Sequence, residues 1–263
     1  MGWRDWIDRR IRQRALGQWS VLADRAGGHG ASLPKRRIRR LRDEAGALRR
    51  DLDRFVSRAD VALATGVGAD ATQGLSQDTD WHWRPDFLIS RATPAALVAP
   101  ESGADLQGQA TIWHDCADRA VILRQIPNTQ TDAPMPFGLQ LETFAFTGSF
   151  LSLAIDLPVD VMTDLGRRHI LRLDMSLTME RETPVYVRLN VAHGPNTDDI
   201  LRQIDTRDAG QQRQVAVEFD LYLIDLNDER LVKLWLDIIV ENPAMNALRI
   251  TDLRLSRRPR AEV

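Results

Sequence analysis

Residues 168–181 read RHILRLDMSLTMER, and this stretch decides the fold class. Apolar side chains occupy every second position from Leu171 to Met179, and mostly polar side chains fill the positions between them. A period of two is the period of a β-strand, whose successive side chains point to opposite faces of a sheet. The stretch is therefore predicted to be a strand with one buried and one polar face.

Three later segments show the same alternation, with apolar side chains that would share the core: residues 185–193, 213–225 and 232–240. Shorter strand candidates precede them at 109–115, 121–126, 139–147 and 149–158. The later segments have no helix-sized insertions between them, whereas parallel strands need crossovers of a dozen or more residues. We therefore expect an antiparallel β-sandwich of about eight to ten strands, resembling a jelly roll.

Several local features of the sandwich can also be predicted. Gly148 alone separates 139–147 from 149–158, so these form a tight hairpin or one long bent strand. Residues 194–211 are expected to be a long loop with a turn of helix at 200–204, and residues 90–108 to be irregular. Apolar positions in the last strand change phase after Ile250, which predicts a β-bulge near Thr251–Asp252.

The N-terminal part is basic and helical in pattern. Residues 1–60 contain 16 Lys and Arg against 8 Asp and Glu, whereas the remainder contains 19 against 29. Residues 2–26 are predicted to form an amphipathic helix that Gly27-Gly28-His29-Gly30 stops. Ser32 is the expected N-cap of a second helix. This helix carries a heptad of apolar residues: Ile38, Ala45, Leu52 and Ala59 at one position, and Leu41, Leu48, Phe55 and Ala62 at another.

The expected class is thus α+β, with a helical arm over 1–64, a linker over 65–80 and a β-sandwich over 81–263. The arm could form a coiled coil that makes an oligomer, fold back on itself or the sandwich, or lie on a membrane surface. Its arginines are not grouped around a recognition motif, so nucleic-acid binding is not expected. No apolar run is long enough for a membrane span.

A candidate ligand site lies on the polar face of the strands. Tyr186, Tyr222 and Trp235 fall on this side, and if their strands are neighbours they would share one sheet face. Flat rings beside hydrogen-bonding groups suit a sugar, whose C–H faces stack on aromatics. The polar groups expected around them are Arg188, Asn190, Glu218, Asp220, Lys233 and Asp237. Alternatively, the helices or a partner cover this face, or it is plain surface.

Other chemical signals are weaker. His114 and Cys116 could suggest a nucleophile and base, but they lack a third group to align them. His193, Asn196, Asp198 and Asp199 could suggest a metal, but they lack an EF-hand pattern. Asp220 and Asp237 could act on a glycoside, yet nothing in the sequence indicates acid–base tuning. Trp81 and Trp83 are expected to plug the start of the β-domain. We predict no catalytic residue, cofactor or metal.

Several segments resemble a bacterial family of unknown function that occurs mainly among alphaproteobacteria: residues 80–85 (DWHWRP), 146–152 (FTGSFLS), 188–196 (RLNVAHGPN) and 257–261 (RRPRA). This resemblance implies no activity and no site residues. The layout is also similar to jelly-roll carbohydrate-binding modules at the level of the fold.

The leading hypothesis is a non-catalytic binding or scaffolding protein whose partner is another protein or a second copy. Glycan or small-ligand binding through Tyr186, Tyr222 and Trp235 is the alternative. The charged N-terminus has no apolar core typical of a secretory signal, and Cys116 is the single cysteine. Both observations favour the cytoplasm.

Overall fold

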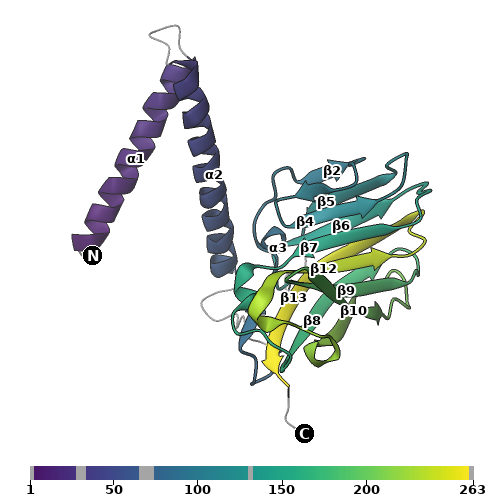
Figure 1. The fold of residues 1–263 in the computed structure, drawn as a ribbon. Helices are drawn as coiled ribbons and strands as arrows, with labels where there is room; N and C mark the ends of the chain where they lie inside the picture. Colours follow the sequence, from purple (N-terminus) through teal and green to yellow (C-terminus); the bar gives the residue numbers. More distant parts are fainter. Residues whose placement is uncertain (1–2, 28–33, 65–73, 130–132, 261–263) are drawn as a thin grey trace. The chain divides into compact units, whose positions relative to one another are not determined.

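The computed structural model describes residues 3–27, 34–64, 74–129 and 133–260. The chain divides into two compact units, Met1–Asp53 and Arg54–Val263. Helix α1 spans Trp3–Gly27, and helix α2 spans Lys35–Ala64 (Figure 1). The predicted N-cap Ser32 lies outside the described residues. None of the helices in the described part of the chain is both long and apolar enough to cross a membrane.

The two helices differ in how they distribute apolar residues. In α1 apolar and polar residues are spread almost evenly around the helix, so the prediction of an amphipathic first helix was wrong. Its tryptophans fall at approximate helical spacing, but the residues between them include further apolar positions on other sides. Helix α2 is strongly amphipathic, as its heptad pattern requires.

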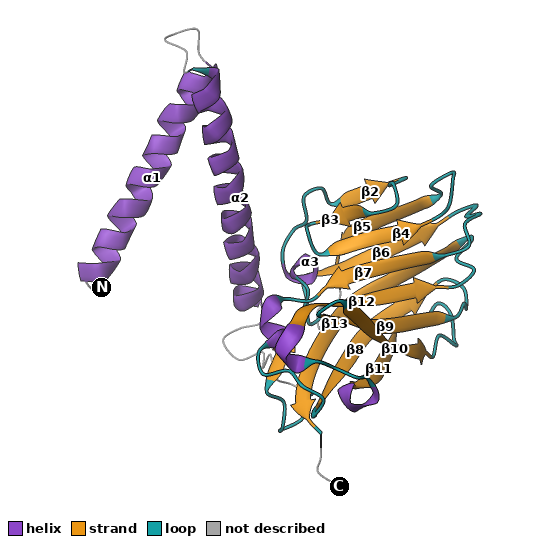
Figure 2. Cartoon of the chain, in the orientation of Figure 1, coloured by secondary structure: helices purple, strands orange, loops and turns teal. Residues whose placement is uncertain are grey.

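The sandwich consists of two antiparallel sheets (Figure 2). The seven-stranded sheet has the order β11 (Arg213–Asp220), β8 (His169–Met179), β13 (Asn246–Pro259), β6 (Phe137–Thr143), β5 (Val121–Pro127) and β2 (Ala96–Val98), with β1 (Trp81–Trp83) paired to β13. The six-stranded sheet has the order β10 (Asn196–Ile204), β9 (Val185–His193), β12 (Leu231–Val240), β7 (Leu151–Asp156), β4 (Ala110–His114) and β3 (Ala104–Leu106). The short helices are α3 (Asp86–Ile89), η1 (Val159–Met162), η2 (Leu221–Leu223) and η3 (Asp228–Arg230).

The alternating stripes of both sheets face one core. Leu171 from the seven-stranded sheet and Leu236 from the six-stranded sheet are fully buried in the same cluster, and Val217 packs against it. Burying one such side chain contributes about 1.5–3 kcal/mol before entropy is counted. From β6 to β9, and again from β12 to β13, the chain alternates between the two sheets. The predicted jelly-roll-like β-sandwich is confirmed.

The predicted loop over 194–211 was wrong, because Asn196–Ile204 forms edge strand β10. This strand pairs with β9 from Asn196 opposite His193 to Ile204 opposite Val185. Gly194, with a φ of 55°, begins the two-residue turn between these strands. Only Ile200 and Ile204 of β10 are buried, so its sequence is mostly polar and lacks the alternation of the inner strands.

Three other boundaries also differ from prediction. Strands β6 and β7 lie in different sheets, so residues 139–158 form neither a hairpin nor one bent strand. Strand β11 ends at Asp220, and the expected continuation to 225 instead begins with η2. Residues 90–108, expected to be irregular, contain the short strands β2 and β3. These boundaries depend on sheet pairing, which no local pattern reveals.

Two bulges set the phase of the C-terminal strands. The register of β13 against β8 shifts between Ile250 and Asp252, which confirms the predicted bulge. A second shift in β12, between Leu231 and Lys233, leaves Val232 61% exposed rather than in the core, where it was predicted. Trp81 and Trp83 are partly buried against the core, as predicted for a plug.

Candidate ligand-binding site

The outward face of the six-stranded sheet carries a groove of about 670 Å³. Strands β4, β7, β9 and β12 supply its lining, together with the turn before β7. We call this surface the sheet groove. Its lining residues are Thr111, Trp113, Phe150, Ser152, Ala154, Asp156, Arg188, Lys233, Trp235, Asp237 and Ile239.

Strand register places two tryptophans at opposite corners of the groove. Trp113 on β4 is opposite Ser152 on β7, which is opposite Ile239 on β12. Trp235 lies four residues before Ile239 on the same strand. With the usual strand spacing and rise per residue, the two tryptophan Cα atoms are about 16 Å apart. Ser152 and Ala154 lie between the two rings and form the floor of the groove. Because their side chains are small, they leave space above the sheet between the rings.

The aromatic rings of the groove are accessible. Trp113 is 46% exposed and Phe150 is 45% exposed, while Trp235 is half-buried. Lys233 Nζ lies 5.6 Å from the centroid of the Trp235 ring. Gly103, at a φ of 88°, lies against the Trp113 ring, where an added Cβ would come within 3.3 Å of it. These rings can therefore stack on a flat, partly apolar ligand.

Asp115 holds the turn that carries Phe150. Its Oδ1 accepts hydrogen bonds from the backbone N–H of Ser149 at 2.7 Å and of Phe150 at 3.2 Å. Its Oδ2 accepts from the Ser149 hydroxyl at 2.5 Å. The Ser149 hydroxyl bond, outweighing desolvation and helped by the backbone bonds, lowers the pKa of the Asp115 carboxyl. These hydrogen bonds tie the turn to the end of β4.

The polar groups of the groove are mutually oriented. The buried Asp237 accepts hydrogen bonds at Oδ2 from Arg188 Nη2 at 2.8 Å and from Asn190 Nδ2 at 2.9 Å. Lys233 Nζ is 2.8 Å from Asp156 Oδ1. Ser152 Oγ has no hydrogen-bond partner among the described residues. The groove therefore combines flat rings with preset donors and acceptors, an arrangement typical of small-ligand sites.

The structure splits the residues predicted to form one site. Six of them lie on β9 and β12 of the six-stranded sheet: Tyr186, Arg188, Asn190, Lys233, Trp235 and Asp237. The other three, Glu218, Asp220 and Tyr222, lie on β11 or η2 at the edge of the seven-stranded sheet. The condition that all these strands be neighbours is not met, because β10 takes the position beside β9. Tyr186 shares the face but does not line the groove.

Arginines already occupy the ring of Tyr222. Arg167 Cζ lies 5.1 Å and Arg260 Cζ 4.6 Å from its centroid. Arg260 also pairs with Asp220 at 3.3 Å, and Glu218 pairs with Arg258 at 3.2 Å. Tyr222 is 55% exposed, but it does not line the sheet groove. Tyr222 is therefore not part of the candidate site.

Sequence reasoning missed Trp113, Phe150 and Ser152. Trp113 was within a recognised strand, and its outward position between the inward Ile112 and His114 was a readable signal. Its position in the groove depends on β4 pairing with β7, which is a non-local fact. Phe150 was within the strand candidate 149–158, in the phase opposite to Leu151 and Leu153, but it lies in the turn before β7, and its position at the groove depends on the pairing of β7 with β4.

In the described part of the chain, Cys116 and His114 contact other groups, so they do not form a catalytic pair. The buried Cys116 Sγ lies 3.8 Å from Thr147 Oγ1, and His114 Nε2 lies 3.1 Å from the Pro100 carbonyl oxygen. Of the residues weighed as metal ligands, His193 Nε2 contacts Asp198 Oδ2 at 2.9 Å. The described residues contain no cluster of three or more side chains suited to a metal ion.

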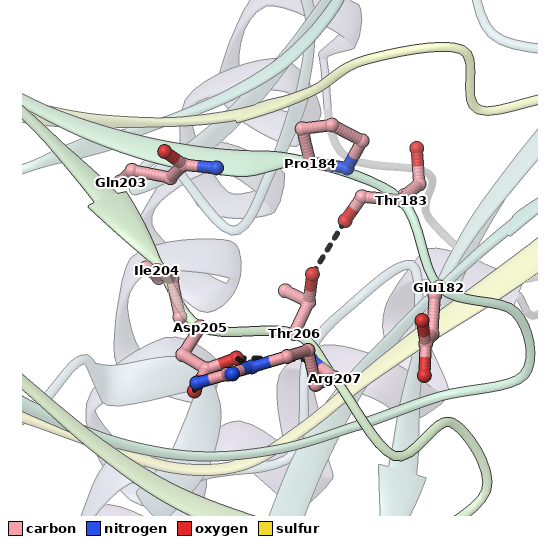
Figure 3. Close-up of a pocket in the computed structure, with 8 residues that line it drawn as sticks. All are labelled: Glu182, Thr183, Pro184, Gln203, Ile204, Asp205, Thr206 and Arg207. Carbon is pink, nitrogen blue, oxygen red and sulfur yellow. Dashed lines mark hydrogen bonds and ion pairs between the residues drawn. The ribbon is translucent and has the colours of Figure 1, made fainter.

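A second hollow, of about 500 Å³, lies where the β9 entry meets the end of β10 (Figure 3). Thr206 Oγ1 donates to the Thr183 carbonyl oxygen at 2.7 Å across it. Asp205 and Arg207 pair with each other at 2.6 Å, and this hydrogen bond strongly lowers the pKa of the Asp205 carboxyl. The charges of Asp205 and Arg207 are thus paired with each other, and no aromatic side chain lines this hollow. We therefore favour the sheet groove.

Comparisons with known proteins found one matching family and several similar solved structures. One family model, described as a family of unknown function, matches residues 2–263. A search of curated proteins found no match. Solved structures with a similar fold include the enzymatically active domain of tailspike protein 4 of bacteriophage CBA120. At 10% identity and a TM-score of 0.42, this match covers 56% of the present chain and only 19% of the tailspike chain.

Two further similar structures are carbohydrate-binding domains. The family 11 carbohydrate-binding module of a Clostridium thermocellum cellulosomal cellulase shares 7% identity, with a TM-score of 0.39 over 56% of this chain and 86% of that one. The CBM22-1 xylan-binding domain from Paenibacillus barcinonensis shares 9% identity, with a TM-score of 0.36 over 63% of this chain and 94% of that one.

Proposed function

The chain belongs to the family of unknown function DUF6478, and we propose that it binds an oligosaccharide in the sheet groove without catalysing a reaction. The observation that carries this proposal is the pairing of accessible Trp113 and Phe150 rings with Trp235 around a polar floor. Sugar rings present apolar C–H faces to aromatics and hydroxyls to polar groups.

The separation of the rings favours a chain of sugars over a single sugar. Trp113 and Trp235 lie at opposite corners, with Cα atoms about 16 Å apart. A monosaccharide contacts one of these rings, whereas a short oligosaccharide reaches both across the floor formed by Ser152 and Ala154. Arg188, held by the buried Asp237, and Lys233, held by Asp156, line the groove and supply hydrogen-bonding groups along that path.

The carboxylates of the groove support a non-catalytic role. Glycoside hydrolysis needs one carboxyl group as a proton donor and a second as a base or nucleophile. Asp156 is held by Lys233, and the buried Asp237 is held by Arg188 and Asn190. Both carboxylates thus serve as fixed structural partners, which suits recognition rather than proton transfer.

A glycan-array screen of the full chain, followed by calorimetric titration of the best oligosaccharide, tests the proposal. Trp113→Ala and Trp235→Ala should each weaken binding by roughly tenfold, because each removes one stacking surface. Tyr222→Ala is the matched control and should bind like the wild type. The absence of binding to any glycan, or an equal loss in all three variants, would overturn the proposal.

A second candidate function is self-association through α2, with a second copy of this chain as the partner. Among the side chains of α2 that the structure describes, four large apolar ones are exposed, by 39% at Leu48, 50% at Leu52, 70% at Phe55 and 53% at Val56. Leu48, Leu52 and Phe55 belong to the heptad, and heptad seams of two identical helices are complementary to each other. This supports the protein-interaction hypothesis.

Light scattering of the full chain measures this directly. A dimeric or larger mass should fall to the monomer mass in Leu52→Lys and Phe55→Lys, since a charge in the seam is desolvated on association. Ala47→Lys introduces the same charge at an exposed position outside the heptad and should leave the mass unchanged. A monomeric wild type would exclude this role.

A further inference from the structure

The outward face of the six-stranded sheet carries more acids than bases. All six of its strands lie within the described residues, and their outward positions alternate with positions that face the core. The charged residues at the outward positions of these strands are the acids Asp105, Asp156, Asp199 and Asp237 and the bases Arg188 and Lys233. The strands of this face therefore have a negative balance.

Both bases are already paired with carboxylates of the sheet groove. Lys233 Nζ lies 2.8 Å from Asp156 Oδ1, and Arg188 Nη2 donates to Asp237 Oδ2 at 2.8 Å. These four charged residues line the groove, and their charges cancel. An acidic sugar that approached either cation would meet the carboxylate already beside it. Like charges brought together in this way disfavour binding.

The other two acids make the surroundings of the groove negative. Asp105 is exposed and lies opposite the groove residue Thr111. Asp199 is exposed and lies two strands from Trp235, because Asn190 is opposite both of them. With the usual strand spacing, the Cα atoms of Asp199 and Trp235 are about 10 Å apart. This is about one Debye length in dilute salt, so the charge of Asp199 acts on a ligand at Trp235.

The aromatic end of the groove has a further carboxylate beside it. Asp115 accepts hydrogen bonds from Ser149 and Phe150, and the bond from the Ser149 hydroxyl lowers the pKa of its carboxyl. The group is therefore charged at neutral pH. It is exposed, and among the described residues no cation is paired with it. Both ends of the groove thus carry a negative charge close to an aromatic ring.

We propose that the sheet groove selects neutral oligosaccharides over acidic ones, with Asp156 as the specificity-determining residue. This proposal rests on the oligosaccharide binding proposed above. Asp156 lies opposite Trp235 in the sheet, and its partner Lys233 places Nζ 5.6 Å from the centroid of the Trp235 ring. A neutral sugar stacked on this ring can offer hydroxyls to both members of the ion pair. A uronic acid there would bring its carboxylate against that of Asp156.

The test measures binding of the full chain to pairs of oligosaccharides in which a carboxylate replaces the primary alcohol. Mannotetraose is paired with tetramannuronic acid, and the strongest neutral hit of the glycan array is paired with the product of oxidising its primary hydroxyls. Calorimetric titration in dilute salt should show at least about tenfold tighter binding of the neutral member. Raising sodium chloride from about 0.05 M to about 0.5 M should narrow this ratio, since salt screens exposed charges.

Asp156→Asn should narrow the ratio by about tenfold, because it removes the opposing carboxylate and releases Lys233 to an acidic sugar. Glu142→Gln is the matched control. Glu142 is also ion-paired, with Arg124 at 2.9 Å, but it lies on β6 of the seven-stranded sheet. Its substitution should leave the ratio unchanged.

The selectivity proposal is overturned if the acidic members bind as tightly as the neutral ones, or if Asp156→Asn and Glu142→Gln change the ratio equally. Either result leaves oligosaccharide binding in the groove intact. The absence of binding to every glycan of the array instead overturns both proposals, so the two failures are distinguishable.

Discussion

The carboxylate of Asp115 ties the turn before β7 to the end of β4. Besides accepting hydrogen bonds from Ser149 and Phe150, it lies so close to Gly148 that a Cβ there would overlap Asp115 Oδ1 and lie 2.8 Å from the Cys116 nitrogen. A glycine is therefore required at position 148 by close approach. One exposed acid and one glycine thus position the Phe150 ring at the rim of the sheet groove.

The lowered pKa of Asp115 predicts a pH-dependent contribution to stability. Because its folded pKa is below the ordinary value of 3.8, the contribution is present above that value and lost as the pH falls through the folded pKa. Asp115→Asn should lower the melting temperature at pH 7, and the difference from the wild type should shrink below about pH 4. Differential scanning calorimetry across about pH 2–7, the range in which carboxyl groups titrate, measures both the lowered melting temperature and its pH dependence.

Asp118→Asn provides the matched control, since Asp118 is an exposed acid in the same loop. It should show no comparable pH-dependent difference. If Asp115→Asn and Asp118→Asn follow the same pH profile, the hydrogen bonds to Ser149 and Phe150 do not stabilise the turn.

At the scale of elements, the bulges and edges of the sheets determine which side chains reach each surface. The β13 bulge lets Leu248 and Ile250 share the core with Leu253 and Leu255 despite their opposite phases. Strand β11 pairs with β8 in the seven-stranded sheet, and this pairing separates Tyr222 from Trp235.

Gly138 on β6 is the point where the bulge comes closest to its neighbour. A Cβ at this position would lie 2.6 Å from the Ile250 carbonyl oxygen and 3.3 Å from Thr251 Cα. Because both are backbone atoms in a paired strand, Gly138→Ala should lower the free energy of unfolding by about 1–3 kcal/mol. Urea unfolding followed by tryptophan fluorescence measures this change.

Gly17→Ala is the corresponding control, since a Cβ there meets nothing within 4 Å. It should leave the unfolding transition of the sandwich unchanged. A wild-type midpoint for Gly138→Ala would show that β6 and β13 can separate without cost at the bulge.

At the scale of the whole sandwich, the two sheets present different chemistry on their outer faces. The six-stranded sheet has exposed aromatic rings beside paired charges, and the seven-stranded sheet has ion pairs. One core lies behind both faces. A residue change on one face should therefore leave ligand binding on the other unaltered, because distant sites are usually additive.

The sequence alone determined the fold class and several local details. The alternation of apolar and polar residues over 168–181 and 185–193 predicted strands with one buried face. The period of two is a property of the strand backbone itself and does not depend on which strand lies beside it. The phase change after Ile250 located the bulge for the same reason. These properties are local, so they can be read along the chain.

Only the tertiary structure decided which strands are neighbours, and therefore which side chains form a site. The sequence analysis grouped Tyr222 with Trp235 on the condition that their strands are neighbours. Strand pairing instead places Trp113 on the same sheet face as Trp235, at the opposite corner of the groove, and Tyr222 contacts Arg167 and Arg260. Strand pairing depends on contacts between residues far apart in the chain. Backbone hydrogen bonds pair the polar edge strand β10 with β9, and such bonds leave no pattern in the sequence.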